Sequence, residues 1–293
     1  MTYAAGNQIQ ASDYNNFLNG ANQLNTVLGV GNGDAGYGQP AISAVSANTQ
    51  ATATQWATLI NKLNAVRSHQ AGSGTGITAP TAGSQIAYLA SLSSGIAAAY
   101  TSRLASASVG TTITGTVNTF NSTNAAYNVA ISQFVDINVT FASAQHARYF
   151  FNAGGRINFV VSASALAATA RSSSLANAIN TAANLTVLIN SNNATAIGYR
   201  QLTTSAVEVK HTSATLPYYG AYSTLSLFSN GLDTTNGANG ASVVCRLYFY
   251  TPADNSFGGN AYIQVSTRAD ITPPETVNLT NSWGTPTVTF DYV

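Results

Sequence analysis

Apolar positions in the first third of the chain recur every three or four residues, which is the spacing of amphipathic helices. The pattern predicts helices over residues 12–28, 52–68 and 84–104. Ser12 suits the N-cap of the first helix, because its hydroxyl can accept a hydrogen bond from a free backbone amide. Gly29 can end the same helix in a left-handed conformation. The third segment is rich in Ala, Ser and Gly, whose small side chains allow another helix to approach closely.

From about residue 110 onward the apolar spacing changes to two, the period of a half-buried strand. Residues 135–141 give the clearest example, with Val135, Ile137 and Val139 alternating with polar residues. Further strands are predicted over residues 206–212, 242–252, 261–271 and 286–293, and an inserted helix over residues 174–189. Only a short turn separates 242–252 from 261–271, so these two strands are expected to pair with each other.

The segment ARYFFNAGGRINFVV, residues 147–161, is the most patterned part of the sequence and predicts a β-hairpin. Asn152 to Gly155 would supply the turn, with at least one of Gly154 and Gly155 at positive φ. Alternation puts the apolar residues of both arms on one face, where burial against the neighbouring strand is expected. Tyr149, Phe151, Ile157 and Phe159 would face Val135, Ile137 and Val139.

Two arginines flank this predicted turn and would lie near each other if the hairpin is tight. Arg148 and Arg156 have two interpretations. Each can pair with a carboxylate or a carbonyl at a domain or subunit contact, which is the interpretation we favour. Alternatively, the pair can clamp an anion or a carboxylate. Asp136, on the polar face of the neighbouring strand, is the expected partner.

The two periods together predict an α+β fold. A helical N-terminal region, residues 1–110, would serve attachment or oligomerisation. An antiparallel β-sandwich or jelly-roll-like domain, residues 111–293, would follow and contain the one inserted helix.

Charge is scarce in this chain. Charged residues make up 6% of the 293 residues and the net charge is +1, whereas roughly 25% is typical of soluble domains. A surface with so few charges favours association, so we expect a subunit of a large assembly rather than a free monomer. The ten Lys and Arg residues are scattered singly, which argues against binding nucleic acid.

The cysteine content and the hydropathy of the chain bear on whether the protein is secreted or contacts a membrane. The single cysteine, Cys245, lies in an apolar run and is expected to be buried, and no disulfide can form within the chain. The first residues lack the basic and apolar regions of a secretory signal. No run approaches the length of a membrane span, so no contact with a membrane is expected.

Catalytic and metal-binding patterns are not found in the sequence. Residues 31–36 match G-x-G-x-x-G but follow a predicted helix, whereas a dinucleotide site needs the pattern after a strand. His69, His146 and His211 lack the spacing of metal ligands. The nine acidic residues are spread along the chain, which makes a catalytic carboxylate pair improbable. We therefore expect no enzyme activity, no cofactor and no metal.

A group of aromatic residues near the C-terminal third supports a second interpretation. Tyr218, Tyr219 and Tyr222 lie in the stretch LPYYGAYS, and Phe257 lies in the turn DNSFGGN. Aromatic faces beside Asn and Asp can stack on sugars, which would make this a receptor- or carbohydrate-binding module. Packing in the core or at a subunit interface is the alternative, and the one we favour from sequence.

Three segments in a fixed order give the chain a family resemblance. These are ASDYNNFLNGANQLNTVLGVGNGDAGYGQ (11–39), QWATLINKLNAVRSHQ (55–70) and ARYFFNAGGRINF (147–159). Their order resembles virion structural proteins of tailed bacteriophages, especially those that infect cyanobacteria, over roughly residues 7–160. Such proteins belong to tail, neck or fibre-associated parts, and the family supplies no catalytic residues to carry over.

The resemblance implies a structural subunit of a bacteriophage particle, assembled in the host cytoplasm and located in the virion. Its partners would be copies of itself, with a trimer favoured, other virion proteins and, in the alternative interpretation, a host-surface glycan. A capsid decoration protein is a third option. Low charge and the lack of catalytic motifs agree with this implication.

Overall fold

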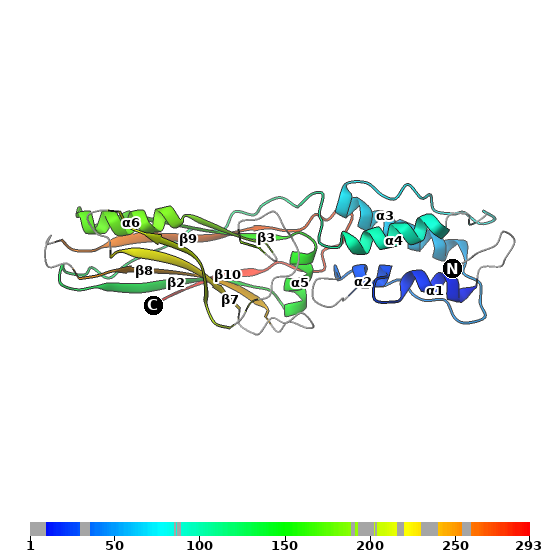
Figure 1. Cartoon of the computed structure of the whole chain (residues 1–293), viewed down its shortest axis with the longest axis horizontal. Coiled ribbons are helices and arrows are strands. Elements are labelled where there is room, and N and C mark those ends of the chain that lie inside the picture. Colours follow the sequence, from blue (N-terminus) through cyan, green and yellow to red (C-terminus); the bar gives the residue numbers. More distant parts are fainter. Residues whose placement is uncertain are drawn as a thin grey trace.

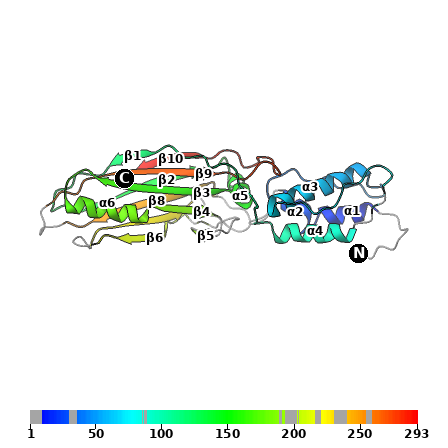
Figure 2. The ribbon, with the colours of Figure 1, turned by 90° about the horizontal axis from the view of Figure 1, so that it is seen from above.

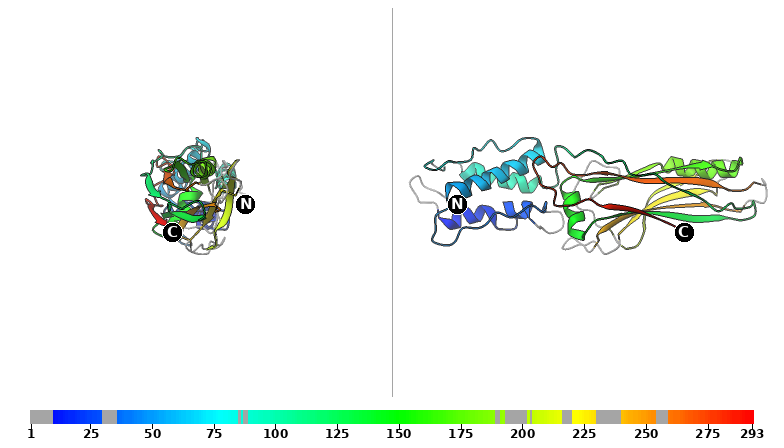
Figure 3. Two further views of the ribbon diagram at one scale, coloured as in Figure 1. Left: turned by 90° about the vertical axis from the view of Figure 1, so that its left-hand side faces the viewer. Right: turned by 180° about the vertical axis from the view of Figure 1, so that it is seen from behind.

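The computed structural model describes residues 10–29, 36–84, 86, 89–188, 191–192, 202, 204–215, 220–229, 240–253 and 259–293. The chain is an α+β protein with an elongated body, and α1 to α4 lie at the opposite end from the strands (Figure 1). Viewed end on, the same body is narrow (Figure 3). The helices are α1 (Ala11–Leu18), α2 (Leu24–Leu28), α3 (Ala53–Ala71), α4 (Leu89–Thr101), α5 (Ala144–Asn152) and α6 (Ala170–Ala182).

The first predicted helix is divided in two. Residues 19–23 separate α1 from α2, and the cap of α1 is Gln10 rather than Ser12. Gly29 ends α2 with a φ of −81°, so the expected left-handed conformation is wrong there. Asn25 in α2 donates to the Ile42 carbonyl, which ties this short helix to the loop that follows it.

The second predicted helix is confirmed as α3, with three further residues at its C-terminal end. Thr52 and Gln55 form a capping box at its start, and Gly72 follows its end at a φ of 78°. Trp56 is fully buried between Tyr14 and Phe17, whose ring centroids lie 5.1 and 6.0 Å away. These rings form the centre of the helical core.

The third predicted helix is shorter than expected, because α4 covers residues 89–101 of the predicted 84–104. Gly95 lies where α4 crosses α3. A Cβ at this position would lie 3.1 Å from Cδ2 of Leu63. A small residue at this position therefore allows the two helices of the same chain to approach.

Strands in the described part of the chain form two antiparallel sheets, ordered β1-β9-β3-β4-β5 and β10-β2-β8-β7-β6. We call the second one the β8 sheet. The strands are β1 (Asn118–Asn121), β2 (Ile131–Thr140), β3 (Arg156–Ala165), β4 (Asn184–Leu188), β5 (Ser191–Asn192), β6 (Val207–Ser213), β7 (Tyr222–Phe228), β8 (Ser242–Thr251), β9 (Ile263–Thr272) and β10 (Thr287–Tyr292). The predicted pairing of 242–252 with 261–271 is wrong, since β8 pairs with β2 and β7 whereas β9 pairs with β1 and β3.

Residues 147–161 do not form a hairpin. The first arm is the helix α5, which begins after the N-cap Ser143, and only the second arm is a strand, β3. The predicted burial of the aromatic residues is correct, because Tyr149, Phe150 and Phe151 are all buried. Val135, Ile137 and Val139 lie on β2, which belongs to the other sheet, so they are not on a strand adjacent to β3.

The turn after α5 depends on its two glycines. Gly154 has a φ of 91°, so the prediction of a positive φ in this turn is confirmed. Gly155 donates its amide to the Phe150 carbonyl, and a Cβ on Gly155 would lie 2.5 Å from the Phe150 ring. The close approach of ring and backbone places Phe150 inside the cluster that it forms with Phe141 and Phe151.

The inserted helix lies earlier in the sequence than predicted, since α6 ends at Ala182 and residues 184–188 form β4. In the described part of the chain, both α5 and α6 are inserted among the strands, where one helix was expected. Asn180 of α6 exchanges hydrogen bonds with the backbone of Ala163 on β3. The Ala178 carbonyl accepts hydrogen bonds from β6 and β7, so α6 connects the two sheets.

Candidate functional site

The alternation of β8 divides its side chains between two environments. Cys245, Leu247 and Phe249 are fully buried in the core, and burial raises the pKa of the Cys245 thiol. Tyr248 and Tyr250 point to the opposite face of the sheet and are half-buried. We call this side, opposite the core, the outer face of the β8 sheet.

Tyr222 on β7 lies directly opposite Tyr250 on β8. Its ring centroid is 5.3 Å from that of Tyr250 and 5.8 Å from that of Tyr248. His211 on β6 stacks on Tyr222 at 5.2 Å with an interplanar angle of 16°. Burial, followed by a hydrogen bond with Tyr248, raises the pKa of Tyr222, so the Tyr222 phenol stays neutral at physiological pH.

Next to the tyrosines, Arg246 forms a bidentate pair with Asp136 on β2. Its Nε and one terminal nitrogen donate to the two carboxylate oxygens at 2.7 and 2.6 Å. The hydrogen bonds that Arg246 donates to Asp136 raise the pKa of Arg246 above its usual value. The guanidinium carbon also lies 4.0 Å from the centroid of the Phe134 ring and 5.2 Å from that of Phe228.

Helix α6 covers the opposite side of these strands. Ser223, which alternates with Tyr222 along β7, donates its hydroxyl to the Ala178 carbonyl of α6 at 3.0 Å. Thr212 donates to the same carbonyl at 2.8 Å. Because successive side chains of a strand point to opposite faces, α6 does not cover the tyrosines.

The residues singled out from sequence are found in different places. Tyr222 lies on the outer face of the β8 sheet, whereas Tyr218, Tyr219 and Phe257 lie outside the described residues. Arg148 lies on α5 and is 2% exposed, and Arg156 begins β3. With no hairpin between them, the two arginines do not face each other across paired strands, and the expected partner Asp136 binds Arg246 instead.

Sequence reasoning missed most of this face. Tyr248 and Tyr250 fall within the strand predicted over residues 242–252 but were not assigned to a site, although their alternation with Leu247 and Phe249 signals a second aromatic face. Arg246 and His211 come from strands that meet Tyr222 only through pairing. No local pattern places them beside it.

A second region of interest joins the helical end to the strands. His69 near the end of α3 and Glu275 in the segment before β10 are both buried, and the Nδ1–Oε1 distance between them is 2.8 Å. Burial lowers the pKa of His69, and Glu275 opposes this only in part. Burial alone would raise the pKa of Glu275, but hydrogen bonds from Asn278, His69 and Val277 together lower it.

Further buried hydrogen bonds reinforce this junction. The Gln39 side chain donates to the Thr280 carbonyl at 2.8 Å and accepts from the Thr280 amide at 2.9 Å. Ser282 donates its hydroxyl to the Tyr37 carbonyl at 2.6 Å. Asn152 at the end of α5 donates to the Gly36 carbonyl at 3.1 Å. Residues far apart in sequence thus fix the helical end against the strands.

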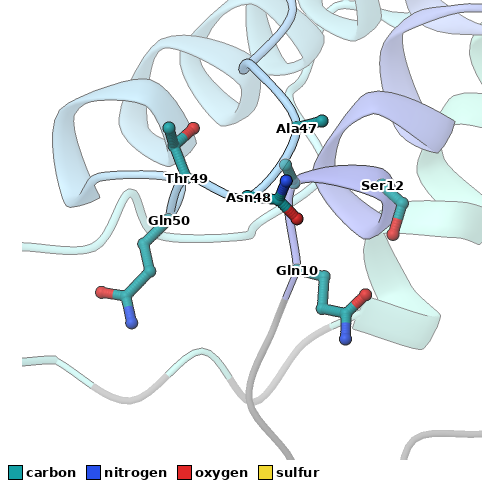
Figure 4. A pocket seen from close by; sticks show the side chains of 7 residues that line it. Gln10, Ser12, Ala47, Asn48, Thr49 and Gln50 are labelled. Carbon is teal, nitrogen blue, oxygen red and sulfur yellow. The ribbon is translucent and has the colours of Figure 1, made fainter.

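Two cavities were found among the described residues. One, of about 400 Å³, lies at the helical end and is lined by Gln10, Ala11, Ser12, Ala47, Asn48, Thr49 and Gln50 (Figure 4). The other, of about 510 Å³, lies near the junction, where Ile113, Phe150, Ile271, Trp283 and Val288 are among its lining residues. The described residues that line these two cavities include no Asp, Glu, His, Lys, Arg or Cys.

Within the described ranges, no group of three or more His, Cys, Asp or Glu side chains is placed to hold a metal ion. None of the helices in that part of the chain is long and apolar enough to cross a membrane. No family model, curated protein or solved structure matches this chain.

Proposed function

We propose that this chain is a structural subunit of a tailed-bacteriophage particle, in a tail, neck or fibre-associated position, acting through protein–protein contacts. The observation that carries the proposal is an elongated body in which buried hydrogen bonds join the helical part to the part that holds the strands. A rigid connection of this kind keeps a projecting part in a fixed direction. The resemblance of residues 7–160 to virion structural proteins agrees with this role.

In this proposal the two antiparallel sheets form a sandwich-like domain. Residues 111–293 would make up that domain, and residues 1–110 the helical attachment region. The segment between β9 and β10 returns to the helical region through Glu275 and Thr280. It would act as a second connection between the two domains, in addition to the segment between α4 and β1.

The subunit would act as a homo-oligomer, with a trimer favoured. Support comes from apolar side chains on and just before β1, a strand that lies next to β10 (Figure 2). Phe120 of β1 and Tyr292 of β10 lie 4.6 Å apart. Ile113 and Val117, in the segment before β1, are 56% and 51% exposed and add apolar surface that a second subunit could cover.

Electron microscopy of phage particles labelled with an antibody to this chain tests the role. We expect label confined to the tail, neck or fibres. Label over the capsid would instead support a decoration protein, and unlabelled particles would refute the proposal. Light scattering of the purified chain tests the oligomer, and a stable monomer of 30.2 kDa would refute that part.

A further inference from the structure

The outer face of the β8 sheet has the chemistry of a carbohydrate-binding surface. Its three tyrosine rings are held together around Tyr222, with centroid distances of 5.3 Å to Tyr250 and 5.8 Å to Tyr248. The face of an aromatic ring carries negative potential, and the C–H groups on one side of a pyranose ring carry partial positive charge, so the two attract. We infer that this face binds an uncharged hexopyranose glycan, with Tyr222 and Tyr250 as its stacking residues.

Hydrogen-bonding side chains lie on the same face of the sheet, on the strand next to the rings, as recognition of sugar hydroxyls requires. The Ser132 hydroxyl is 3.0 Å from the Tyr248 hydroxyl, and register places Ser132 opposite Tyr250. Farther along the same face, Asn138 donates to Asp291 at 2.8 Å. These contacts fix the side chains before a ligand arrives, which reduces the entropy lost on binding.

The charges on this face argue against an anionic or a cationic ligand. Binding a phosphate-rich polymer requires available cations, but Arg246 is paired with Asp136, and the carboxylate of Asp291 lies in the same row. A ligand cation would sit over an aromatic ring. Over Phe134 that place is already taken by the Arg246 guanidinium.

A second copy of the chain is a less suitable occupant. Ile113 and Val117, two of the large exposed apolar side chains, lie in the segment just before β1, where Ile113 bridges to Ile271 of β9 in the other sheet. The tyrosine face instead combines ring surface with hydroxyl groups, which suits a ligand that is apolar on its ring faces and polar at its edges. Glycan binding does not depend on the particle role proposed above, and the two can fail separately.

Calorimetric titration with defined oligosaccharides tests the inference. The probes are β-1,4-linked glucose, α-1,4-linked glucose, β-1,4-linked galactose and α-linked mannose hexasaccharides. We expect at least one to bind. Tyr222→Ala and Tyr250→Ala should each weaken that binding about tenfold or more, because each removes a stacking ring. Tyr222→Trp should retain binding, since it keeps an aromatic face.

Tyr100→Ala is the matched control. It removes another half-buried tyrosine, but from α4 in the helical region, and should leave glycan affinity unchanged. If Tyr222→Ala is poorly folded, Tyr222→Trp and Tyr222→Leu replace it, because both retain bulk while only one retains the ring. The inference is overturned if none of the four probes binds, or if binding survives in Tyr222→Ala and Tyr250→Ala. It is equally overturned if these variants change only the oligomeric state.

Discussion

Glu275→Ala should strongly destabilise the fold, because it removes the buried acceptor at the junction. Glu275 is 5% exposed, and its partner His69 is fully buried with Nδ1 2.8 Å away. The same carboxylate accepts the backbone amides of Val277 and Asn278 at 2.6 and 3.0 Å. Because its lowered pKa keeps His69 neutral at pH 7, the loss is that of hydrogen bonds to a buried carboxylate, and each buried donor left without this acceptor costs about 1–3 kcal/mol. Together such losses are a large part of the roughly 5–15 kcal/mol that stabilises a typical domain.

Urea unfolding at pH 7 measures this loss, and two tryptophans report on it. Trp56 lies in the helical core and Trp283 in the segment before β10, so fluorescence follows both sides of the junction. The control is Glu208→Ala. Glu208 is 53% exposed, and its partner His211, at 3.5 Å, is 47% exposed. A surface pair of this kind contributes at most about 1 kcal/mol. If Glu275→Ala and Glu208→Ala lower the free energy of unfolding by the same small amount, the buried pair does not stabilise the junction between the helical region and the strands.

Three further predictions concern pH, the aromatic cluster and the turn after α5. Burial lowers the pKa of His69 below its usual 6.5. As the pH falls, the unfolded state therefore binds a proton at a higher pH than the folded state does. Stability should therefore fall as the pH drops below about 6.5, and thermal melting of His69→Gln should show a weaker pH dependence between pH 7 and 5. Phe151→Ala should cost about 3–5 kcal/mol in urea unfolding, while Tyr127→Ala, at an exposed ring, should cost less than about 0.5 kcal/mol. Gly154→Val forces a β-branched residue to a φ of 91° and should lower the yield of folded protein, whereas equal yields of variant and parent would contradict the strain.

The sequence predicted those elements in which one face is buried and the other is in water. In α3, Trp56, Leu59, Ile60 and Leu63 recur at helical spacing because only one side of the helix meets the core. In β8, buried and half-buried residues alternate for the same reason. The helix starts next to Thr52, as predicted, but it continues past the predicted end at residue 68 to Ala71, before Gly72.

The helix α5 could not be read from its apolar pattern. Its last six residues, from Ala147 to Asn152, are all buried, so burial marks no single face of the helix, and the alternating aromatic residues were interpreted as a strand. Ser143 was the available signal, since its side chain accepts from the His146 amide as an N-cap. The predicted hairpin followed from the glycines and the aromatic residues. The burial of those rings was correctly inferred because it depends on their size and apolarity.

Sequence alone determined that the chain has a helical first third, antiparallel strands after it, a buried Cys245 and an aromatic stretch that includes Tyr222. These are local properties, set by side-chain periodicity and hydropathy. Tertiary structure alone decided that β8 and β9 enter different sheets and that Glu275 meets His69. It also decided that Tyr222, Tyr250 and Arg246 share one face. The physical reason is that strand pairing and buried hydrogen bonds join residues far apart in the chain. Such contacts do not depend on the periodicity of neighbouring residues, so the local sequence does not reveal them.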